Sequence, residues 1–212
     1  MTAKGETFFR EKEGSPRVPF RDSRFFAGEK KEERNMLYHG SAAAGIRTLQ
    51  ARGEKRVVYL TDNYVYALFY LRDPQIDFVT CGVTRDGTVC YEERFPDQIR
   101  TLYAGRSGWI YRCEESAQME KTRVPGIWVS REDVPVAGAE YIADAYEAIA
   151  PYLADGRVRV RAFETLSAQE RAGNDGAIAE YIRNSGIIRE TSPRAAFYRE
   201  RFPAAWEQAK RD

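Results

Sequence analysis

The stretch RVVYLTDNYVYALFYLRD, residues 56–73, changes its pattern of side chains in the middle. Its first third is rich in β-branched and aromatic residues, which favour a strand. Apolar side chains then recur at the spacings of three and four residues that are typical of a helix, at Val65, Leu68 and Phe69. Thr61 and Asp62 are suitable residues to cap that helix, and Pro74 would end it. The stretch therefore predicts a strand that runs directly into a helix.

Other segments with strand-like or helix-like patterns surround this stretch. The strand-like segments are MLYHGS (36–41), the two runs that flank a turn at Asp86-Gly87 (76–95), GWIYRCEE (108–115), GIWVSRED (126–133) and RVRVRAF (157–163). The helix-like segments are AAAGIRTLQARG (42–53, helix or turn), AEYIADAYEAIAPYLADG (139–156, interrupted at Pro151), a segment from Ser167 to Ile182 with a capping box at Ser167 and Glu170, and a segment that starts at Ser192-Pro193. About six or seven strands without regular alternation with helices predict an α+β fold.

Composition divides the chain into three parts. Residues 1–35 are rich in Lys, Arg and Glu and end in the charge run GEKKEERN, yet they also contain five phenylalanines. We expect a charged N-terminal arm there, either ordered against the body or mobile, with Met36 as an alternative translational start. Residues 36–165 carry the strand-like segments and form the expected core. Residues 166–212 form the expected helical appendage packed on that core.

The composition also excludes several classes of protein. With 43% hydrophobic and 13% aromatic residues, the 212-residue chain can build a packed interior, and its net charge of +1 supplies no strong field toward nucleic acid or a membrane. No run approaches the ~18 consecutive apolar residues of a membrane span, so we expect no membrane partner and a cytoplasmic location. Cys81, Cys90 and Cys113 form no CxxC pair and His39 is the single histidine, so we expect neither a disulfide framework nor a metal site. The phosphate-binding patterns GxGxxG and GxxxxGK[ST] do not occur.

Three short segments gather residues that can carry chemistry. They are Tyr38-His39-Gly40-Ser41, the stretch from Tyr59 to Tyr70, and Glu140-Tyr141-Ile142. Each has a purely structural explanation as well. A histidine at a strand end readily finds a hydrogen bond, tyrosines pack in cores with the hydroxyl at the rim, and a glutamate at a helix N-terminus is favoured by the helix dipole. Only the combination of the three segments points to a function.

In combination the three segments resemble the His-Tyr-Glu branch of the ADP-ribosyltransferase family, typified by the catalytic domain of diphtheria toxin and by the poly(ADP-ribose) polymerases. Members have a strand that ends in Tyr-His-Gly-Ser or Tyr-His-Gly-Thr, then two tyrosines eleven residues apart, and then a glutamate, which the toxin follows with Tyr-Ile. Residues 38–41, Tyr59 with Tyr70, and Glu140 match these positions in order and spacing. Ala67 departs from the serine with which the polymerases bind the nicotinamide amide. The resemblance covers roughly residues 36–165.

The resemblance implies an ADP-ribosyltransferase-like fold, which is a mixed, mostly antiparallel, split β-sheet core with flanking helices. It implies that NAD is bound as a substrate and that no metal takes part. Tyr59 and Tyr70 would stack on the cationic nicotinamide ring. Gly40 would pair its backbone with the carboxamide, and His39 and Ser41 would support the ribose of the adenosine.

The resemblance also implies the catalytic residues, which are Glu140, His39 and Tyr59. Cleavage of the bond between nicotinamide and ribose develops positive charge on the ribose, and a carboxylate beside the ribose stabilises that charge. Glu140 would take this role. Glu147 and Glu164 are rival candidates, and the Glu-Tyr-Ile context favours Glu140.

The implied function is transfer of ADP-ribose from NAD to an unidentified acceptor macromolecule, protein or nucleic acid, with release of nicotinamide. NAD glycohydrolase, in which water is the acceptor, is the nearest alternative, and an RNA 2′-phosphotransferase of a related branch is a weaker one. A non-catalytic module that binds NAD or ADP-ribose is an alternative from another class. Arg157, Arg159 and Arg161 share one face of their predicted strand, which we interpret as a solvated face rather than a contact for an anionic target.

Overall fold

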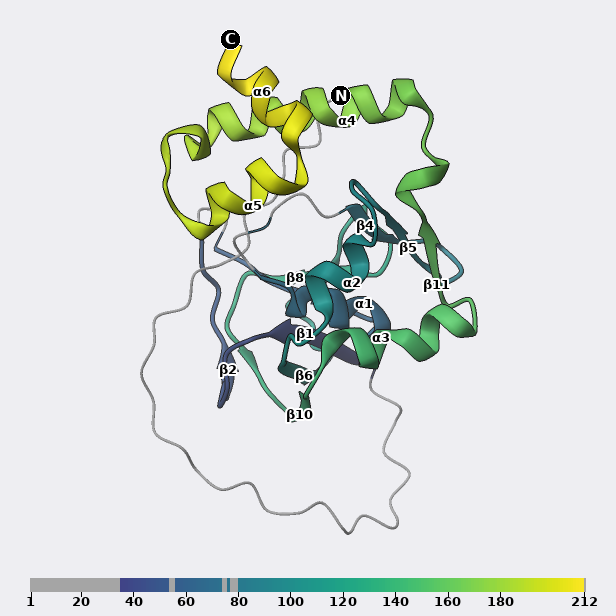
Figure 1. Ribbon diagram of the computed structural model, residues 1–212. Helices are drawn as coiled ribbons and strands as arrows, with labels where there is room; N and C mark the ends of the chain where they lie inside the picture. The colour runs from purple at the N-terminus through teal and green to yellow at the C-terminus, as the bar shows by residue number, and fades with distance from the viewer. Residues whose placement is uncertain (1–34, 54–55, 74–75, 77–79, 212) are drawn as a thin grey trace.

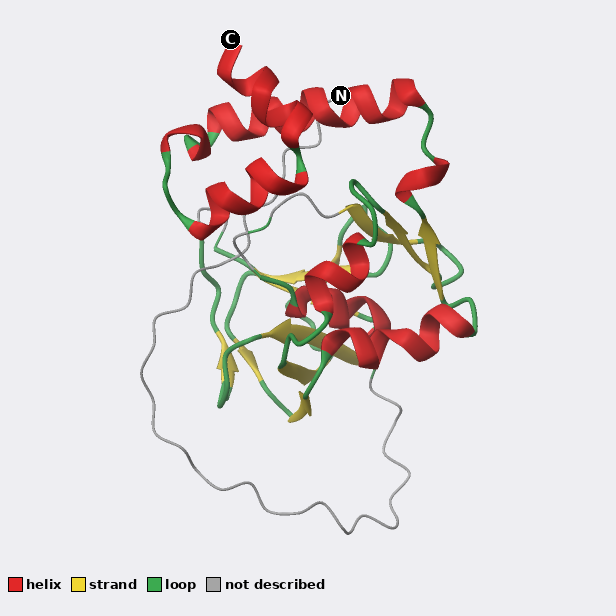
Figure 2. Cartoon of the chain, in the orientation of Figure 1, coloured by secondary structure: helices red, strands yellow, loops and turns green. Residues whose placement is uncertain are grey.

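A six-stranded sheet and a three-stranded sheet form the framework of the protein (Figure 1). The computed structural model describes residues 35–53, 56–73, 76 and 80–211. The expected N-terminal arm therefore lies outside the described residues, apart from its last residue. The sheets are mostly antiparallel and are accompanied by several helices (Figure 2), which confirms the predicted α+β class.

The larger sheet is antiparallel throughout and has β1 among its central strands. Its order is β10 (Gly138–Ile142), β6 (Gly108–Glu114), β1 (Met36–Ser41), β3 (Val58–Thr61), β8 (Ile127–Ser130) and β7 (Met119–Lys121). The predicted strands at 36–41 and 108–115 are thus confirmed within one residue of their ends, and the strand predicted at 126–133 is confirmed but ends three residues earlier, at Ser130. Strand β10 was not predicted.

The smaller sheet combines a hairpin with one parallel strand. Strands β4 (Thr80–Val83) and β5 (Val89–Glu92) flank the predicted turn at Asp86-Gly87, where Gly87 has a φ of 84°. Strand β11 (Val158–Arg161) pairs with β5 in parallel. A third pairing joins β2 (Thr48–Leu49) to β9 (Val134–Pro135).

Helices of two kinds surround these sheets. Short helices α1 (Tyr64–Leu68), η1 (Phe69–Leu71), α2 (Gln98–Tyr103) and α3 (Ala145–Ala154) lie within the body, whereas η2 (Phe163–Thr165), α4 (Ala168–Asn184), η3 (Ile187–Arg189), α5 (Pro193–Arg201) and α6 (Pro203–Arg211) follow β11. Helices α4, α5 and α6 gather at one end of the molecule (Figure 1). No helix in the described part of the chain is long and apolar enough to cross a membrane.

The two faces of the larger sheet pack against different apolar clusters. Ile110 belongs to the larger cluster, which includes the buried residues of α1, and the half-buried Tyr38 packs against it. Leu37 and Cys113 belong to a smaller cluster on the opposite face. The larger cluster continues into the C-terminal helices, where the ring of Phe95 meets the rings of Phe197 and Phe202 at centroid distances of 5.9 and 5.4 Å. Helix α1 therefore covers the Tyr38 face.

Two predicted boundaries around α1 and α3 are wrong. Thr61 stays in β3 and Asp62 accepts a hydrogen bond from the indole of Trp128 (3.0 Å), so the cap of α1 is Asn63, whose side chain accepts from the N–H of Tyr66 (2.9 Å). Residues 139–142 are strand rather than helix, because pairing with β6 prevails over the helical spacing of their apolar side chains. Helix α3 begins only after its cap, Asp144.

Two further segments differ from a predicted helix. Of the helix or turn predicted at residues 42–53, no helix forms; the segment contributes the short strand β2 and ends in a turn at Gly53. Pro151 does not interrupt α3, which continues to Ala154, and the N–H of Asp155 bonds to the Pro151 carbonyl (3.1 Å). The capping box of Ser167 and Glu170 and the helix start at Ser192-Pro193 are confirmed.

Candidate active site

Strand register places Gly40 and Glu140 on the same face of the larger sheet. Gly40 pairs with Ile110 in β6, and Ile110 pairs with Glu140 in β10. Directly paired residues of neighbouring strands project to the same side, so Glu140 projects from the face that α1 covers. Two strand spacings separate Gly40 from Glu140, which is about 10 Å. Glu140 itself is exposed.

Tyr59 extends this row on the other side of Gly40. The pairing between β1 and β3 has the single partner pair Tyr38 and Thr61 among the described residues. Continued by two residues, the same register brings Tyr59 opposite Gly40. The row therefore runs from Tyr59 through Gly40 and Ile110 to Glu140. It brings together one residue from each of the three predicted motifs.

The backbone of Gly40 is turned toward the place where β1 and β3 part. A hydrogen bond from the N–H of Glu115 to the carbonyl of Asn35 (3.1 Å) fixes the alternation along β1, so that residues 37, 39 and 41 turn their backbone groups toward β6. Gly40 consequently turns its N–H and C=O toward β3, beyond the last partner pair. One donor and one acceptor of the main chain are thereby presented side by side at the edge of the row.

His39 bonds to the backbone at the same opening, although the alternation of β1 places its side chain on the face of Ser41 and not on that of Gly40. Its Nδ1 lies 3.0 Å from the carbonyl oxygen of Tyr59. A carbonyl oxygen only accepts, so Nδ1 donates, and in the neutral ring Nε2 is then an acceptor. The imidazole thus bonds to the β3 backbone at the point where further pairing of β1 with β3 would place a backbone hydrogen bond. Its role as a ribose ligand stays a prediction.

The absence of a side chain at Gly40 has a packing reason. A Cβ at this position would overlap the carbonyl oxygen of Ala67 in α1 and would lie 3.0 Å from Cβ of Tyr70. The end of α1 and η1 therefore pack directly on β1, and Tyr70 is brought beside Gly40. Tyr70 is half-buried and its ring meets Tyr66 edge to face at 5.3 Å. Close packing, and not only access for a ligand, requires glycine here.

Ser41 lies on the opposite face from Gly40 and Glu140. Its Oγ accepts a hydrogen bond from the N–H of Ala43 (3.2 Å). The cross-strand neighbours of Ser41 on this opposite face are Trp109 and Tyr141. Their rings form a tilted pair with centroids 5.2 Å apart, and Tyr141 is 55% exposed. The register thus separates Ser41 from the row of Tyr59, Gly40 and Glu140.

Tyr64 joins the site although the sequence did not single it out. Its hydroxyl donates to Oε1 of Glu140 (3.1 Å), and its ring meets that of Tyr38 edge to face at 5.5 Å. Burial, followed by the charge of Glu140 and the hydrogen bond to it, raises the pKa of Tyr64 above its usual range. The available signal was an aromatic residue directly after the helix cap, inside the stretch that already held Tyr59 and Tyr70.

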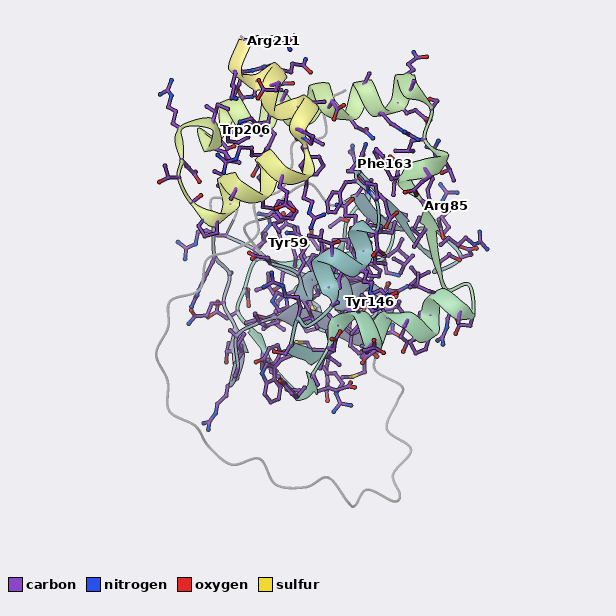
Figure 3. The ribbon with its side chains drawn as sticks, in the orientation of Figure 1. Tyr59, Arg85, Tyr146, Phe163, Trp206 and Arg211 are labelled. Carbon is purple, nitrogen blue, oxygen red and sulfur yellow. The ribbon has the colours of Figure 1, made fainter. Side chains whose placement is uncertain are left out.

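The remaining candidates lie elsewhere. Glu147 is in the first turn of α3 and Glu164 is in η2, so neither belongs to the row of Gly40 and Glu140. Arg157 pairs with Asp155 (2.6 Å), and Arg161 pairs with Glu92 (3.0 Å) and Glu170 (2.6 Å). In Figure 3 Tyr59 lies in the body of the protein, whereas Trp206 lies in the C-terminal helices.

Comparison with known proteins adds no relative. No protein-family model matches the chain, and no curated protein or solved structure is significantly similar to it. Within the residues described, no group of three or more His, Cys, Asp or Glu side chains is placed to hold a metal ion. The function therefore has to be inferred from the row of residues on the larger sheet.

Proposed function

We propose that this chain is an NAD-dependent ADP-ribosyltransferase with an ADP-ribosyltransferase-like fold. The observation that carries the proposal is the strand row in which Gly40 and Glu140 share one face about 10 Å apart. Tyr59 extends that row and Tyr70 packs beside Gly40. These are the residues that the sequence motifs assign to NAD.

The chemical groups in this row suit the nicotinamide end of NAD. A carboxamide carries one acceptor and two donor hydrogens, and the main-chain N–H and C=O of Gly40 complement them. Tyr59 and Tyr70 would supply aromatic faces to a cationic ring, an attraction of order 0.5–2 kcal/mol. Nicotinamide at Gly40 would put its ribose between β1 and β10, within the reach of Glu140.

Glu140 would supply the catalytic charge. As the nicotinamide bond breaks, positive charge develops on the ribose, and a carboxylate beside it stabilises the transition state more than the ground state. The same carboxylate can accept a hydrogen bond from the ribose 2′-hydroxyl and polarise the incoming nucleophile. In the described residues Glu140 forms no ion pair, so no side-chain cation offsets its charge.

The acceptor distinguishes the proposal from its nearest alternative. Transfer to a protein or nucleic acid and hydrolysis by water use the same residues, so NAD glycohydrolase is the second candidate function. The position of Glu140 on the exposed edge strand β10 favours transfer, because a macromolecule could approach that edge. A non-catalytic NAD-binding module would need the same nicotinamide contacts but no carboxylate at Glu140.

The test is nicotinamide release from NAD by the purified protein and two variants. Glu140→Gln keeps the size and polarity of the side chain and removes its charge. Glu147→Gln is the matched control, because Glu147 is an exposed glutamate of the neighbouring helix outside the row. We expect release by the wild type and by Glu147→Gln, and loss of release in Glu140→Gln.

Two other outcomes would reject parts of the proposal. Equal release by Glu140→Gln and wild type would remove Glu140 from catalysis. Saturable binding of NAD in calorimetry, weakened by Tyr59→Ala but without release at any protein concentration, would favour the binding module. Radiolabel from the adenylate part of NAD that becomes attached to macromolecules would identify a transferase, whereas free ADP-ribose alone would identify a glycohydrolase.

A further inference from the structure

Tyr64 is the residue that the structure joins to Glu140. The two are 76 positions apart in the chain, and the phenol hydroxyl donates to Oε1 at 3.1 Å. Glu140 lies on an exposed edge strand, where a glutamate side chain would otherwise sample several rotamers. One of its two carboxylate oxygens is therefore occupied by a fixed donor.

The donor is fixed by its own surroundings. Tyr64 is the first residue of α1, directly after the capping side chain of Asn63, and the four residues that follow it are buried. Its ring meets Tyr38 edge to face, with an interplanar angle of 85°. Tyr38 is held in β1 by its pairing with Thr61 on one side and Arg112 on the other. The hydroxyl position is thus set by the helix and by the sheet together.

The phenol also keeps its proton. Burial is the largest cause that raises the pKa of Tyr64, and the negative charge of Glu140 adds to it. Tyr64 is consequently protonated, and a hydrogen-bond donor, near neutral pH. It is suited to hold a carboxylate and not to take a proton from a substrate.

We infer that Tyr64 is a positioning residue for Glu140. The Tyr64 hydroxyl holds Oε1 of the carboxylate and leaves Oε2 for the ribose of NAD. The inference rests on the proposed function and deepens it. Because the role inferred for the hydroxyl is to orient Glu140 and not to bind NAD, its loss should lower kcat and leave KM for NAD nearly unchanged. If the hydroxyl had a purely structural role, its removal would instead lower the melting temperature and would change both kcat and KM or neither of them.

The experiment compares Tyr64→Phe with Tyr66→Phe. Tyr66→Phe removes the same hydroxyl from the same helix, but that hydroxyl bonds to the carbonyl of Cys81 (3.3 Å). We expect Tyr64→Phe to lower kcat roughly 10- to 100-fold with KM for NAD changed less than about twofold. Tyr66→Phe should retain wild-type kcat. In the Glu140→Gln background, Tyr64→Phe should have little further effect, because the group that it orients is already gone.

A second measurement follows the contact without turnover. In a pH titration followed by the ¹³Cζ shift of labelled tyrosine, Tyr64 should begin to lose its proton at a lower pH in Glu140→Gln than in wild type, because the charge of Glu140 no longer raises the pKa of Tyr64. An unchanged pKa would overturn the contact itself. Turnover that Tyr64→Phe leaves at the wild-type kcat would overturn the positioning role alone. Absence of nicotinamide release from the wild type would overturn the proposed function, and the positioning role of Tyr64 with it.

Discussion

Arg161 on the smaller sheet and Glu140 on the larger sheet have different kinds of partner. On the outer face of the smaller sheet, Arg161 is paired with Glu92 and with Glu170, at 3.0 and 2.6 Å. On the larger sheet, Glu140 has a neutral phenol as its hydrogen-bond partner and is exposed. Paired charges on a surface stabilise a fold modestly, whereas a carboxylate held by a neutral donor keeps its full charge for a ligand. The difference separates a structural surface from a candidate site.

The largest effect that would test this difference is on catalysis. Glu140→Gln should lower the rate of nicotinamide release by roughly 10² to 10³, the size seen when one electrostatic contact to a transition state is removed. Glu92→Gln removes a carboxylate that pairs with both Arg94 and Arg161, and it should leave the rate unchanged. Its cost in unfolding free energy should stay below about 1 kcal/mol, as chemical denaturation would measure. A comparable rate loss in both variants would erase the distinction between the sheets.

A second contrast concerns the strand glycines Gly40 and Gly82. A Cβ at Gly40 would overlap the Ala67 carbonyl oxygen, while a Cβ at Gly82 in β4 would meet nothing within 4 Å. Gly40→Ala should therefore cost roughly 1–3 kcal/mol of unfolding free energy and weaken NAD binding. Gly82→Ala should be neutral or slightly stabilising, because it reduces the freedom of the unfolded chain. Equal melting temperatures of the two variants would contradict the close contact of α1 with β1.

A smaller effect is expected at the start of α4, on the smaller-sheet side. Ser167→Ala removes the cap of this helix and should cost about 1 kcal/mol. Hydrogen bonds from the Ser167 backbone and from Arg161 lower the pKa of Glu170 to about 2. A lowered carboxylate pKa stabilises the fold above the unfolded value of about 4.3, and this contribution disappears as the pH falls toward 2.

The measurement for this helix is the melting temperature of wild type and Glu170→Gln between pH 6 and pH 2. The wild type should lose its advantage over the variant as the pH falls from about 4.5 to about 2. A constant difference between the two proteins across that range would contradict the pairing of Glu170 with Ser167 and Arg161.

The smallest perturbation is chemical labelling of thiols in the native protein. Cys90 is exposed on the smaller sheet, whereas burial in the larger sheet raises the pKa of Cys113 to about 12. Iodoacetamide at pH 8 should therefore modify Cys90 first and Cys113 only after unfolding. Mass spectrometry of peptides would detect the order. Early modification of Cys113 would show that the apolar cluster beneath the larger sheet opens readily.

Local signals predicted the parts of the fold that depend on neighbouring residues. The hairpin around Asp86-Gly87 and the capping box of Ser167 are set by three or four consecutive residues, and both were predicted. The helix start at Asn63 was placed one or two residues early, because Thr61 and Asp62 are equally good caps by type. Contacts with Gly126 and with Trp128, 66 positions away, remove Asp62 from that role.

Contacts between distant segments explain what the sequence could not predict. Residues 139–142 have helical spacing, and only their pairing with β6 makes them a strand. The motifs named Gly40, Tyr59 and Glu140 as candidate site residues, but the motifs carry no information on which face each residue occupies. Tyr64 escaped attention because its importance depends on a partner in another motif. The sequence thus predicted the candidate residues, and the register of the larger sheet arranges them.

The parallel pairing of β11 with β5 also affects how the chain folds during synthesis. Strand β5 ends at Glu92, and its second neighbour, β11, is complete only at Arg161. Until the ribosome has released that segment, one edge of the β4–β5 hairpin remains open. Open strand edges invite pairing with other chains. We therefore expect fragments that stop before β11 to aggregate, so any shortened version of this protein has to retain β11.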